Sequence, residues 1–219
     1  MDIWIDSVNT PNIQKAVRLG FLSGVTTNPT LISESNENFE DILKGLLHHQ
    51  EGPVAVQVVS SNTADMVQEG QNLFSYSTRI IVKVPITKNG LEAIHLLGRQ
   101  GIPTMATVVF TPHQALMAAL ADADYIAPYI GRIENSGADP WMVLTAMAQI
   151  LKNYKFKTQI LGASIKTVEH AAKCAEIGIS GITVRDEIFE KLIEDNPLTA
   201  QCVNKFAEDW KNVNTPLFA

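Results

Sequence analysis

The 219-residue sequence predicts an α/β fold, a single (β/α)8 TIM barrel domain over residues 1–219 with an extra helix near its C-terminus. Residues 80–85 (Ile-Ile-Val-Lys-Val-Pro) carry apolar, β-branched side chains on both parities, which is typical of a strand covered on both faces in a parallel sheet. Strand-like and helix-like segments alternate eight times with short connections. The hydrophobic content of 46 % supplies ample core, and no linker or low-complexity segment divides the chain.

The expected strands are short runs rich in β-branched and apolar residues. They span residues 3–5, 24–27, 54–58, 80–85, 104–110, 125–129, 159–163 and 181–184. Asn28-Pro29 breaks the second of them, since the residue before a proline is biased away from regular structure.

The expected helices follow these strands and are marked by capping residues. They span residues 10–20, 39–48, 63–74, 89–99, 111–121, 139–153, 167–177, 187–193 and about 198–211. Three begin with a capping residue followed by proline, at Thr10-Pro11, Thr111-Pro112 and Asp139-Pro140. Gly20 and Gly178 are natural C-terminal stops, and Asn196-Pro197 separates the last amphipathic helix from the barrel.

The composition excludes several classes of function. The net charge is −6 and the pI is near 5.3, with no basic stripe, so we expect no nucleic-acid partner. No apolar run approaches the ~18 residues of a membrane span, and the start of the chain lacks an export signal, so we expect a cytoplasmic protein without membrane contact. Cys174 and Cys202 fit no metal spacing, and the five histidines form no ligand motif, which favours a reduced chain with no metal site.

Lys83 is the only charge in the run at residues 80–85. Lysine is rarely buried without a reason, so it either snorkels out of the end of the strand or is kept there for chemistry. Burial lowers a lysine pKa, and a neutral amine is a nucleophile toward carbonyl carbon. Lowering the pKa from about 10.4 to about 7 costs roughly 4 to 5 kcal/mol, which a fold can absorb at one site.

A ring of polar residues stands at the C-terminal ends of the expected strands, the face where such barrels carry their active sites. Its members are Asp6, Thr26 with Asn28, Gln57, Lys83, Thr107, Tyr129 with Arg132, Ser164 with Lys166, and Arg185. Local roles are open for some of them: Asp6 as a helix cap, Asn28 as a turn residue, Thr107 as a hydrogen-bonding group within the sheet. Turns alone do not require a polar residue at nearly every strand end around one lysine. We therefore expect these residues to form a single functional site.

Imine chemistry suggests roles for the catalytic group. Lys83 would attack a ketone and form an iminium that acts as the electron sink for breaking a carbon–carbon bond. Asp6 would hold substrate hydroxyls and stabilise the cation. Tyr129 would move the proton of the cleaving hydroxyl, alone or through a water that Gln57 orients. We place Thr107 in this catalytic group as well.

A second group would bind the substrate. Arg132 is a forked donor suited to phosphate, and Ser164 and Lys166 follow the seventh strand, where barrels often bind phosphate. Thr26 and Asn28 complete this group. The local alternatives are a surface ion pair between Arg132 and Glu134 and a solvated Lys166.

Four motifs stand in order along the chain: Gly24-Val25-Thr26-Thr27-Asn28-Pro29-Thr30, Val82-Lys83-Val84-Pro85, Ala127-Pro128-Tyr129-Ile130-Gly131-Arg132-Ile133 and Ala163-Ser164-Ile165-Lys166. Together they resemble the signatures of the small transaldolase and fructose-6-phosphate aldolase family. The resemblance covers essentially the whole chain, including Asp6 and the helix around residues 206–210. It implies a Schiff-base lysine at Lys83, sugar phosphate substrates, and neither a metal nor an organic cofactor. It also implies a homo-oligomer of pentameric rings stacked into decamers, in which the last helix packs on a neighbouring subunit.

Two positions separate the branches of this family. Members that resemble transaldolase carry glutamate at the position of Gln57 and phenylalanine at that of Tyr129, whereas the aldolases carry glutamine and tyrosine. The sequence therefore favours a fructose-6-phosphate aldolase, which cleaves its substrate reversibly to dihydroxyacetone and glyceraldehyde 3-phosphate. The close alternative is a transaldolase, which transfers the dihydroxyacetone unit between sugar phosphates as in the pentose phosphate pathway. A catalytically silent phosphate-binding barrel is remote, because it would not need Lys83, Asp6 and Tyr129 together.

Three positions depart from the family pattern. Ser7 replaces a usual threonine, and Phe110 replaces a tyrosine at the mouth of the barrel. Arg185 stands where a proline commonly follows the last strand. It would either add charge to the phosphate site or pair with the adjacent Asp186, and we lean to the pair.

Overall fold

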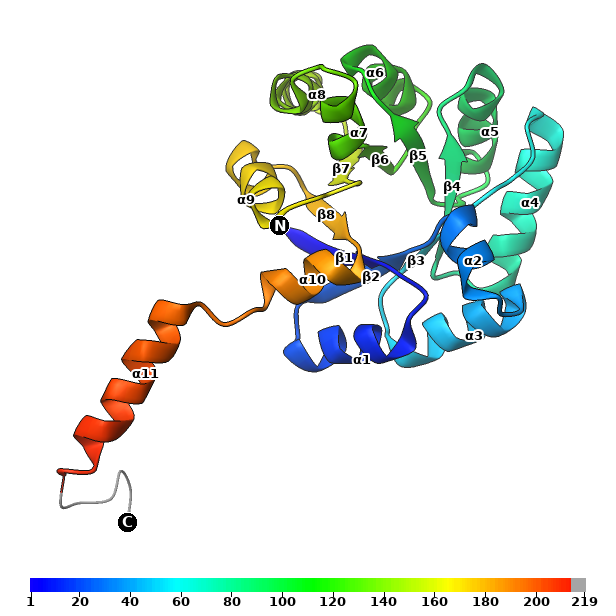
Figure 1. Ribbon diagram of the computed structural model, residues 1–219. Helices are drawn as coiled ribbons and strands as arrows, with labels where there is room; N and C mark the ends of the chain where they lie inside the picture. Colours follow the sequence, from blue (N-terminus) through cyan, green and yellow to red (C-terminus); the bar gives the residue numbers. More distant parts are fainter. Residues whose placement is uncertain (214–219) are drawn as a thin grey trace.

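Eight parallel strands form a closed barrel in the computed structural model, which describes residues 1–213 (Figure 1). The strands pair in sequence order, and β8 pairs with β1 to close the sheet. They are β1 (Asp2–Asp6), β2 (Leu22–Thr26), β3 (Val54–Gln57), β4 (Ile80–Pro85), β5 (Thr104–Val109), β6 (Tyr125–Pro128), β7 (Gln159–Gly162) and β8 (Gly181–Val184). The predicted barrel is confirmed, and the predicted strand bounds agree to within two residues.

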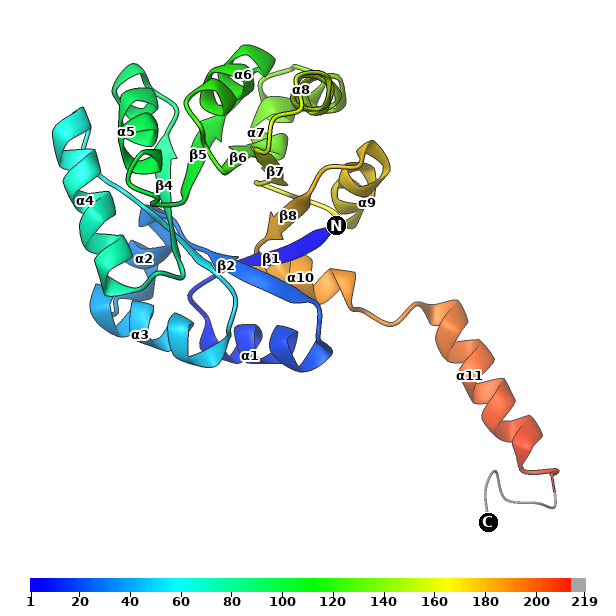
Figure 2. The same ribbon diagram turned by 180° about the vertical axis from the view of Figure 1, so that it is seen from behind.

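All the described helices except the last, α11 (Pro197–Trp210), surround the barrel on its outer face (Figure 2). The others are α1 (Thr10–Leu19), α2 (Pro29–Ser35), α3 (Phe39–His49), α4 (Thr63–Tyr76), α5 (Lys88–Gly98), α6 (Pro112–Leu120), α7 (Ile130–Asn135), α8 (Pro140–Asn153), α9 (Val168–Ile177) and α10 (Asp186–Leu192). The sequence did not predict α2 and α7. Both are short, with 7 and 6 residues, and both begin within three residues of a strand end.

One predicted cap needs correction. Asn9, not Thr10, caps α1: its side chain accepts the N–H of Asn12. Asn28-Pro29 was expected to break the second strand, and β2 does end at Thr26; the Asn28 side chain also accepts the N–H of Leu31 and so begins α2.

The interior of the barrel is filled by residues at alternate positions of the strands. We call six of them the packed layer: Trp4, Ala55, Ile81, Met105, Ala127 and Leu161, all at most 5 % exposed. The Trp4 indole meets the Tyr125 ring edge to face at a centroid distance of 5.8 Å. A Cβ at Gly24 would lie 2.7 Å from the Trp4 ring, so β2 can pass this side chain only with glycine there. Residues two positions further along each strand face the mouth of the barrel.

Helix α11 departs from the barrel and projects away from it in both views (Figures 1 and 2). None of its residues is buried. Leu198, Phe206 and Trp210 are 69 %, 66 % and 46 % exposed. An isolated helix of 14 residues is only marginally stable in water. We therefore expect this exposed apolar stripe to pack against a partner surface. Within residues 1–213, no helix combines the length and apolarity needed to cross a membrane.

Candidate active site

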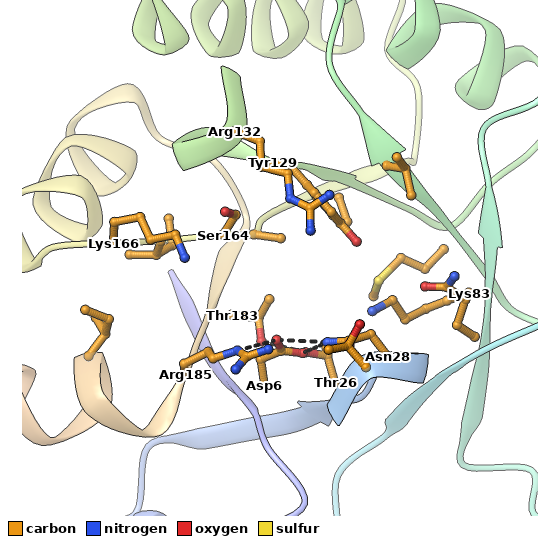
Figure 3. Close-up of a pocket in the computed structure, with 18 of the residues that line it drawn as sticks. Asp6, Thr26, Asn28, Lys83, Tyr129, Arg132, Ser164, Lys166, Thr183 and Arg185 are labelled. Carbon is orange, nitrogen blue, oxygen red and sulfur yellow. Dashed lines mark hydrogen bonds and ion pairs between the residues drawn. The ribbon is translucent and has the colours of Figure 1, made fainter. Parts of the chain in front are cut away.

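A cavity of about 700 Å³ opens where the strands end (Figure 3). Nine of the ten predicted site residues line it: Asp6, Thr26, Asn28, Gln57, Lys83, Tyr129, Arg132, Ser164 and Lys166. The tenth, Thr107, is buried directly behind Tyr129 and hydrogen-bonds to it. The structure thus brings all ten to one mouth, from strands on every side of the barrel.

Lys83 extends from β4 into this cavity and is only 5 % exposed, so it does not snorkel into solvent. Its Nζ donates a hydrogen bond of 2.6 Å to the backbone carbonyl of Thr27. Burial lowers the pKa of Lys83 below 10.5, while the negative charge of Asp6 acts in the opposite direction. Because burial dominates, the neutral amine that attacks carbonyl carbon is populated more than in an exposed lysine.

Asp6, at the end of β1, is held by its neighbours in a fixed orientation. The Thr26 hydroxyl donates to Oδ1 at 2.7 Å, and the Asn28 amide donates to Oδ2 at 3.3 Å. Thr26 also shares a 2.8 Å hydrogen bond with Thr183 of β8. The Asp6 side chain keeps 18 % of its surface exposed to the cavity side, so its carboxylate remains open to a ligand hydroxyl.

Tyr129 follows β6, and its hydroxyl lies 3.1 Å from Oγ1 of Thr107. Its ring packs edge to face against Phe110, with centroids 6.0 Å apart, and the Arg132 guanidinium lies 5.2 Å from the ring centroid. A phenol with an adjacent hydroxyl partner can pass a proton along a two-member chain. Gln57 pairs in register with Lys83 across β3 and β4, and both side chains line the cavity.

Arg132, Ser164 and Lys166 form the cationic side of the cavity (Figure 3). Glycine at position 131 allows Ser164 and Lys166 to lie this close to α7, because a Cβ there would lie 2.6 Å from Cγ of Lys166 and 2.7 Å from the Ser164 carbonyl oxygen. Ser164 adopts a φ of 57°, in the left-handed region that few L residues occupy. The ion pair between Arg132 and Glu134, which was the local alternative for Arg132, does not form within the described residues 1–213.

Glu134 turns away from Arg132 instead. Its carboxylate lies 3.4 Å from Nε2 of His170, a buried histidine of α9 whose ring packs against Trp141 of α8. This contact ties α7 to α9 and leaves the Arg132 guanidinium directed to the cavity.

The backbone is strained beside Tyr129. Val108, which lines the cavity, has a φ of 63°, and the pairing of β5 with β6 shifts register between Ala106 and Val109. A β-branched residue rarely takes this conformation, which costs roughly 1 to 3 kcal/mol and concentrates at functional sites. At this bulge Val108 lines the cavity while the adjacent Thr107 is buried.

Arg185 does not form the ion pair with Asp186 that the sequence favoured. Its Nε lies 3.8 Å from Oδ2 of Asp6, and its NH1 lies 3.9 Å from Oε2 of Glu34 on α2. Asp186 instead accepts a 2.9 Å hydrogen bond from the Ser7 hydroxyl, and burial raises its pKa above 3.8. Arg185 has extended backbone (φ −70°, ψ 161°), so the two adjacent side chains leave the chain in different directions.

Sequence reasoning missed several contributors to the site, among them the polar residues Thr30, Thr183 and Glu187, which line the cavity. Thr183 lines the cavity two positions before Arg185, and strand alternation alone would have placed it inside the barrel. The Thr27 carbonyl, which accepts from Lys83, carries no signal in side-chain chemistry. Glu34 lies on α2, a helix that was not predicted. Within residues 1–213, no group of three or more His, Cys, Asp or Glu side chains is placed to hold a metal ion.

Comparisons with known proteins agree with this geometry. The family model described as Transaldolase/Fructose-6-phosphate aldolase matches residues 3–217. A probable transaldolase of Hydrogenobaculum sp. is 38 % identical over 213 residues, which is 97 % of this chain and 98 % of that protein. Probable transaldolases of Aquifex aeolicus (37 % identical, 97 % of this chain and 98 % of that protein) and Thermoplasma volcanium (38 % identical, 98 % and 97 %) are similar along their whole length. The chain is therefore a member of the transaldolase/fructose-6-phosphate aldolase family of Schiff-base enzymes.

Proposed function

We propose that this protein is a transaldolase, which moves a dihydroxyacetone unit from a ketose phosphate to an aldose phosphate through a Schiff base on Lys83. One observation carries the chemistry: a lysine buried to 5 % exposure, with a lowered pKa, lies in a cavity that also holds a fixed carboxylate. The names of the relatives support transfer better than the release of free dihydroxyacetone that the sequence favoured.

The first half of the reaction makes the imine and breaks the bond. The neutral Lys83 amine attacks C2 of the open-chain ketose, and loss of water gives the iminium. The Tyr129 hydroxyl relays the proton of the C4 hydroxyl to water, giving up its own proton as it accepts the new one, and the electron pair of the C3–C4 bond flows into the iminium to give an enamine. The aldehyde product leaves. Asp6 binds substrate hydroxyls and stabilises the iminium charge across the low-dielectric cavity.

The second half returns the enzyme. In transfer, C3 of the enamine attacks the carbonyl carbon of the acceptor aldehyde, whose oxygen takes the proton back from Tyr129. Water then hydrolyses the new iminium, which releases the longer ketose and restores the amine. Gln57, next to Lys83 in register, orients this water but cannot titrate.

The substrate phosphate binds on the cationic side of the cavity. Arg132 offers a planar fork to two phosphate oxygens, and Ser164 and Lys166 add a hydroxyl and an ammonium. The cavity of about 700 Å³ has room for a sugar phosphate that reaches from Lys83 to this cluster.

Release of dihydroxyacetone is the second candidate, and a specific observation favours it. Gln57 and Tyr129 are the pair of the aldolase branch, and the Tyr129 hydroxyl already has a proton partner in Thr107 at 3.1 Å. In this case C3 of the enamine is protonated, and hydrolysis of the resulting iminium frees dihydroxyacetone and turns fructose 6-phosphate cleavage into a lyase reaction.

One partition experiment decides between them. Wild-type enzyme is given fructose 6-phosphate with and without erythrose 4-phosphate, and dihydroxyacetone and sedoheptulose 7-phosphate are quantified. Transfer predicts that most turnovers end in the seven-carbon ketose once acceptor is present. Free dihydroxyacetone as the main product at saturating acceptor would contradict transaldolase and establish the aldolase.

We further propose that α11 packs on a neighbouring subunit of a homo-oligomer. The support is its projection from the barrel and its exposed stripe of Leu198, Phe206 and Trp210. The test replaces Phe206 and Trp210 with serine and measures mass by light scattering. Loss of the oligomer with a folded barrel would support the proposal, and an unchanged mass would refute it.

A cytoplasmic location is also proposed. Its support is chemical: Cys174 and Cys202 are both free, with Cys174 buried and Cys202 exposed. Free thiols persist in reducing compartments. Fractionation of cells with an epitope-tagged chain tests this, and recovery in an exported fraction would contradict it.

A further inference from the structure

We propose that Arg185 is a positioning residue for Asp6, and that Glu34 holds Arg185 in place through a second contact. This inference rests on the lysine-dependent reaction proposed above. Arg185 lines the cavity from the end of β8. Figure 3 shows its guanidinium beside Asp6, on the side of the cavity away from Arg132. The two contacts join three separate elements, β1, β8 and α2, at one side of the mouth.

The junction of β8 and α10 holds the end of β1 at two consecutive positions. Arg185 lies 3.8 Å from the Asp6 carboxylate, and Asp186 accepts a 2.9 Å hydrogen bond from the Ser7 hydroxyl. Ser7 in turn accepts the N–H of Asn9 at 2.9 Å, which fixes the turn into α1. Because β8 and β1 are the strands that close the barrel, this double contact sets where Asp6 lies relative to the rest of the ring.

Both oxygens of Asp6 have partners. Thr26 donates to Oδ1, the Asn28 amide donates to Oδ2 at 3.3 Å and to Oδ1 at 3.5 Å, and Arg185 approaches Oδ2. Of these partners Arg185 is the only cation, so it alone compensates the carboxylate charge at close range. Removal of Arg185 would leave the Asp6 carboxylate held only by the neutral donors of Thr26 and Asn28, with no cation beside Oδ2 to fix the position in which it meets substrate hydroxyls.

A direct phosphate contact is the competing role for Arg185, and its surroundings disfavour it. Two carboxylates flank the guanidinium, at 3.8 and 3.9 Å, so a phosphate that approached it would meet Asp6 and Glu34 as well. By contrast, within residues 1–213 neither Arg132 nor Lys166 has a carboxylate within 4.0 Å. The charge of Arg185 is therefore already matched by carboxylates, whereas the charges of Arg132 and Lys166 are not, in the part of the chain that the structure describes.

The test compares three substitutions with a matched control. Arg185→Met keeps an unbranched stem without the charged guanidinium, Arg185→Lys keeps a charge, and Glu34→Gln removes the carboxylate that contacts Arg185 from α2. Lys173→Met is the control, because Lys173 is an ion-paired cation of similar exposure on α9, 46 % against 41 % for Arg185. Each variant is assayed with fructose 6-phosphate as donor and with erythrose 4-phosphate or unphosphorylated erythrose as acceptor. Thermal melts report folding.

Positioning predicts that Arg185→Met lowers kcat by about 10- to 100-fold with both acceptors, as for other displacements of a catalytic group by ~1 Å. The ratio of the two acceptor KM values stays within about threefold of wild type. Arg185→Lys recovers part of the loss, and Glu34→Gln gives a smaller loss in the same direction.

Three outcomes overturn the inference. Arg185→Met could match the Lys173→Met control, or Arg185→Lys could be as impaired as Arg185→Met. A rise in KM confined to the phosphorylated acceptor would instead make Arg185 a phosphate ligand. Wild-type enzyme that neither cleaves nor transfers, and forms no reducible adduct, would refute the proposed function itself, a result distinct from all three.

Discussion

The packed layer and the mouth of the barrel use the same strands and differ by two residues along each. Asp6 follows Trp4, Gln57 follows Ala55, Lys83 follows Ile81, Thr107 follows Met105, and Tyr129 follows Ala127. The first member of each pair is apolar and closely packed, and the second is polar and faces the cavity or its wall. Along each of these strands, the residue that stabilises the core and the residue that faces the site are therefore two positions apart.

The two layers contribute to the fold with opposite sign. Burial of Trp4, Ile81 and Met105 is favourable at roughly 25 cal/mol per Å² of apolar surface removed from water. At the mouth, the buried ammonium of Lys83 and the backbone of Val108 at a φ of 63° both cost free energy. The fold can therefore tolerate these unfavourable contributions at the site, because the packed layer beneath it is apolar and buried.

The largest effect is expected from Lys83→Met. Loss of the nucleophile should reduce kcat by at least about 10³-fold, since no imine can form at this position. The free energy of unfolding should stay the same or rise, because a desolvated amine is replaced by an apolar chain of similar length. Activity assays and urea titrations measure the two quantities. The exposed Lys88→Met is the control, and a comparable loss of activity there would contradict the assignment.

Ile81→Ala tests the layer below and should show the reverse pattern. Truncation of this residue, 5 % exposed, should lower the free energy of unfolding by about 2 to 5 kcal/mol. Activity per folded molecule should remain within a few-fold of wild type at a temperature where the variant is folded. A loss of activity as large as that of Lys83→Met, in a folded protein, would show that the layers are not separable.

Tyr129→Phe separates steps within the mouth. Cleavage should fall by about 10- to 100-fold, while the rate of imine formation should change little, because the phenol acts on the C4 hydroxyl rather than on Lys83. Rapid-quench trapping of the imine and steady-state assays measure the two rates. Equal losses in both steps would argue against a proton-transfer role.

The smallest expected effect is a pH dependence of stability from Lys83. Its folded-state pKa is lowered, so between that pKa and 10.5 the unfolded chain binds a proton that the folded chain does not. Stability should therefore rise with pH in this window, by up to about 1.4 kcal/mol per pH unit, relative to Lys83→Met. Urea titrations of both proteins between pH 7 and 10 measure the difference. A flat difference would mean that burial does not lower this pKa.

Most of the barrel was predictable because alternation, β-branched runs and Pro or Gly punctuation repeat in every unit. The two missed helices are too short to show helical periodicity: α2 has 7 residues and α7 has 6. All ten predicted site residues converge because strand ends of a parallel barrel meet at one face.

What the sequence could not provide was the pairing of side chains across the mouth. Arg185 and Asp186 are adjacent and opposite in charge, yet Arg185 contacts Asp6 and Glu34 while Asp186 contacts Ser7. Barrel closure brings residues 6 and 185 together over a separation of nearly the whole chain, and this depends on the register between β1 and β8.

The most direct test of the account is to trap the imine. Wild-type enzyme is incubated with fructose 6-phosphate and sodium borohydride, digested, and analysed by peptide mass spectrometry, with Lys83→Met and Lys88→Met in parallel. The account predicts a reduced three-carbon or six-carbon adduct on Lys83 in the wild-type and Lys88→Met proteins and none in Lys83→Met. A folded wild-type protein with Lys83 unlabelled, or with the adduct on another lysine, would contradict it.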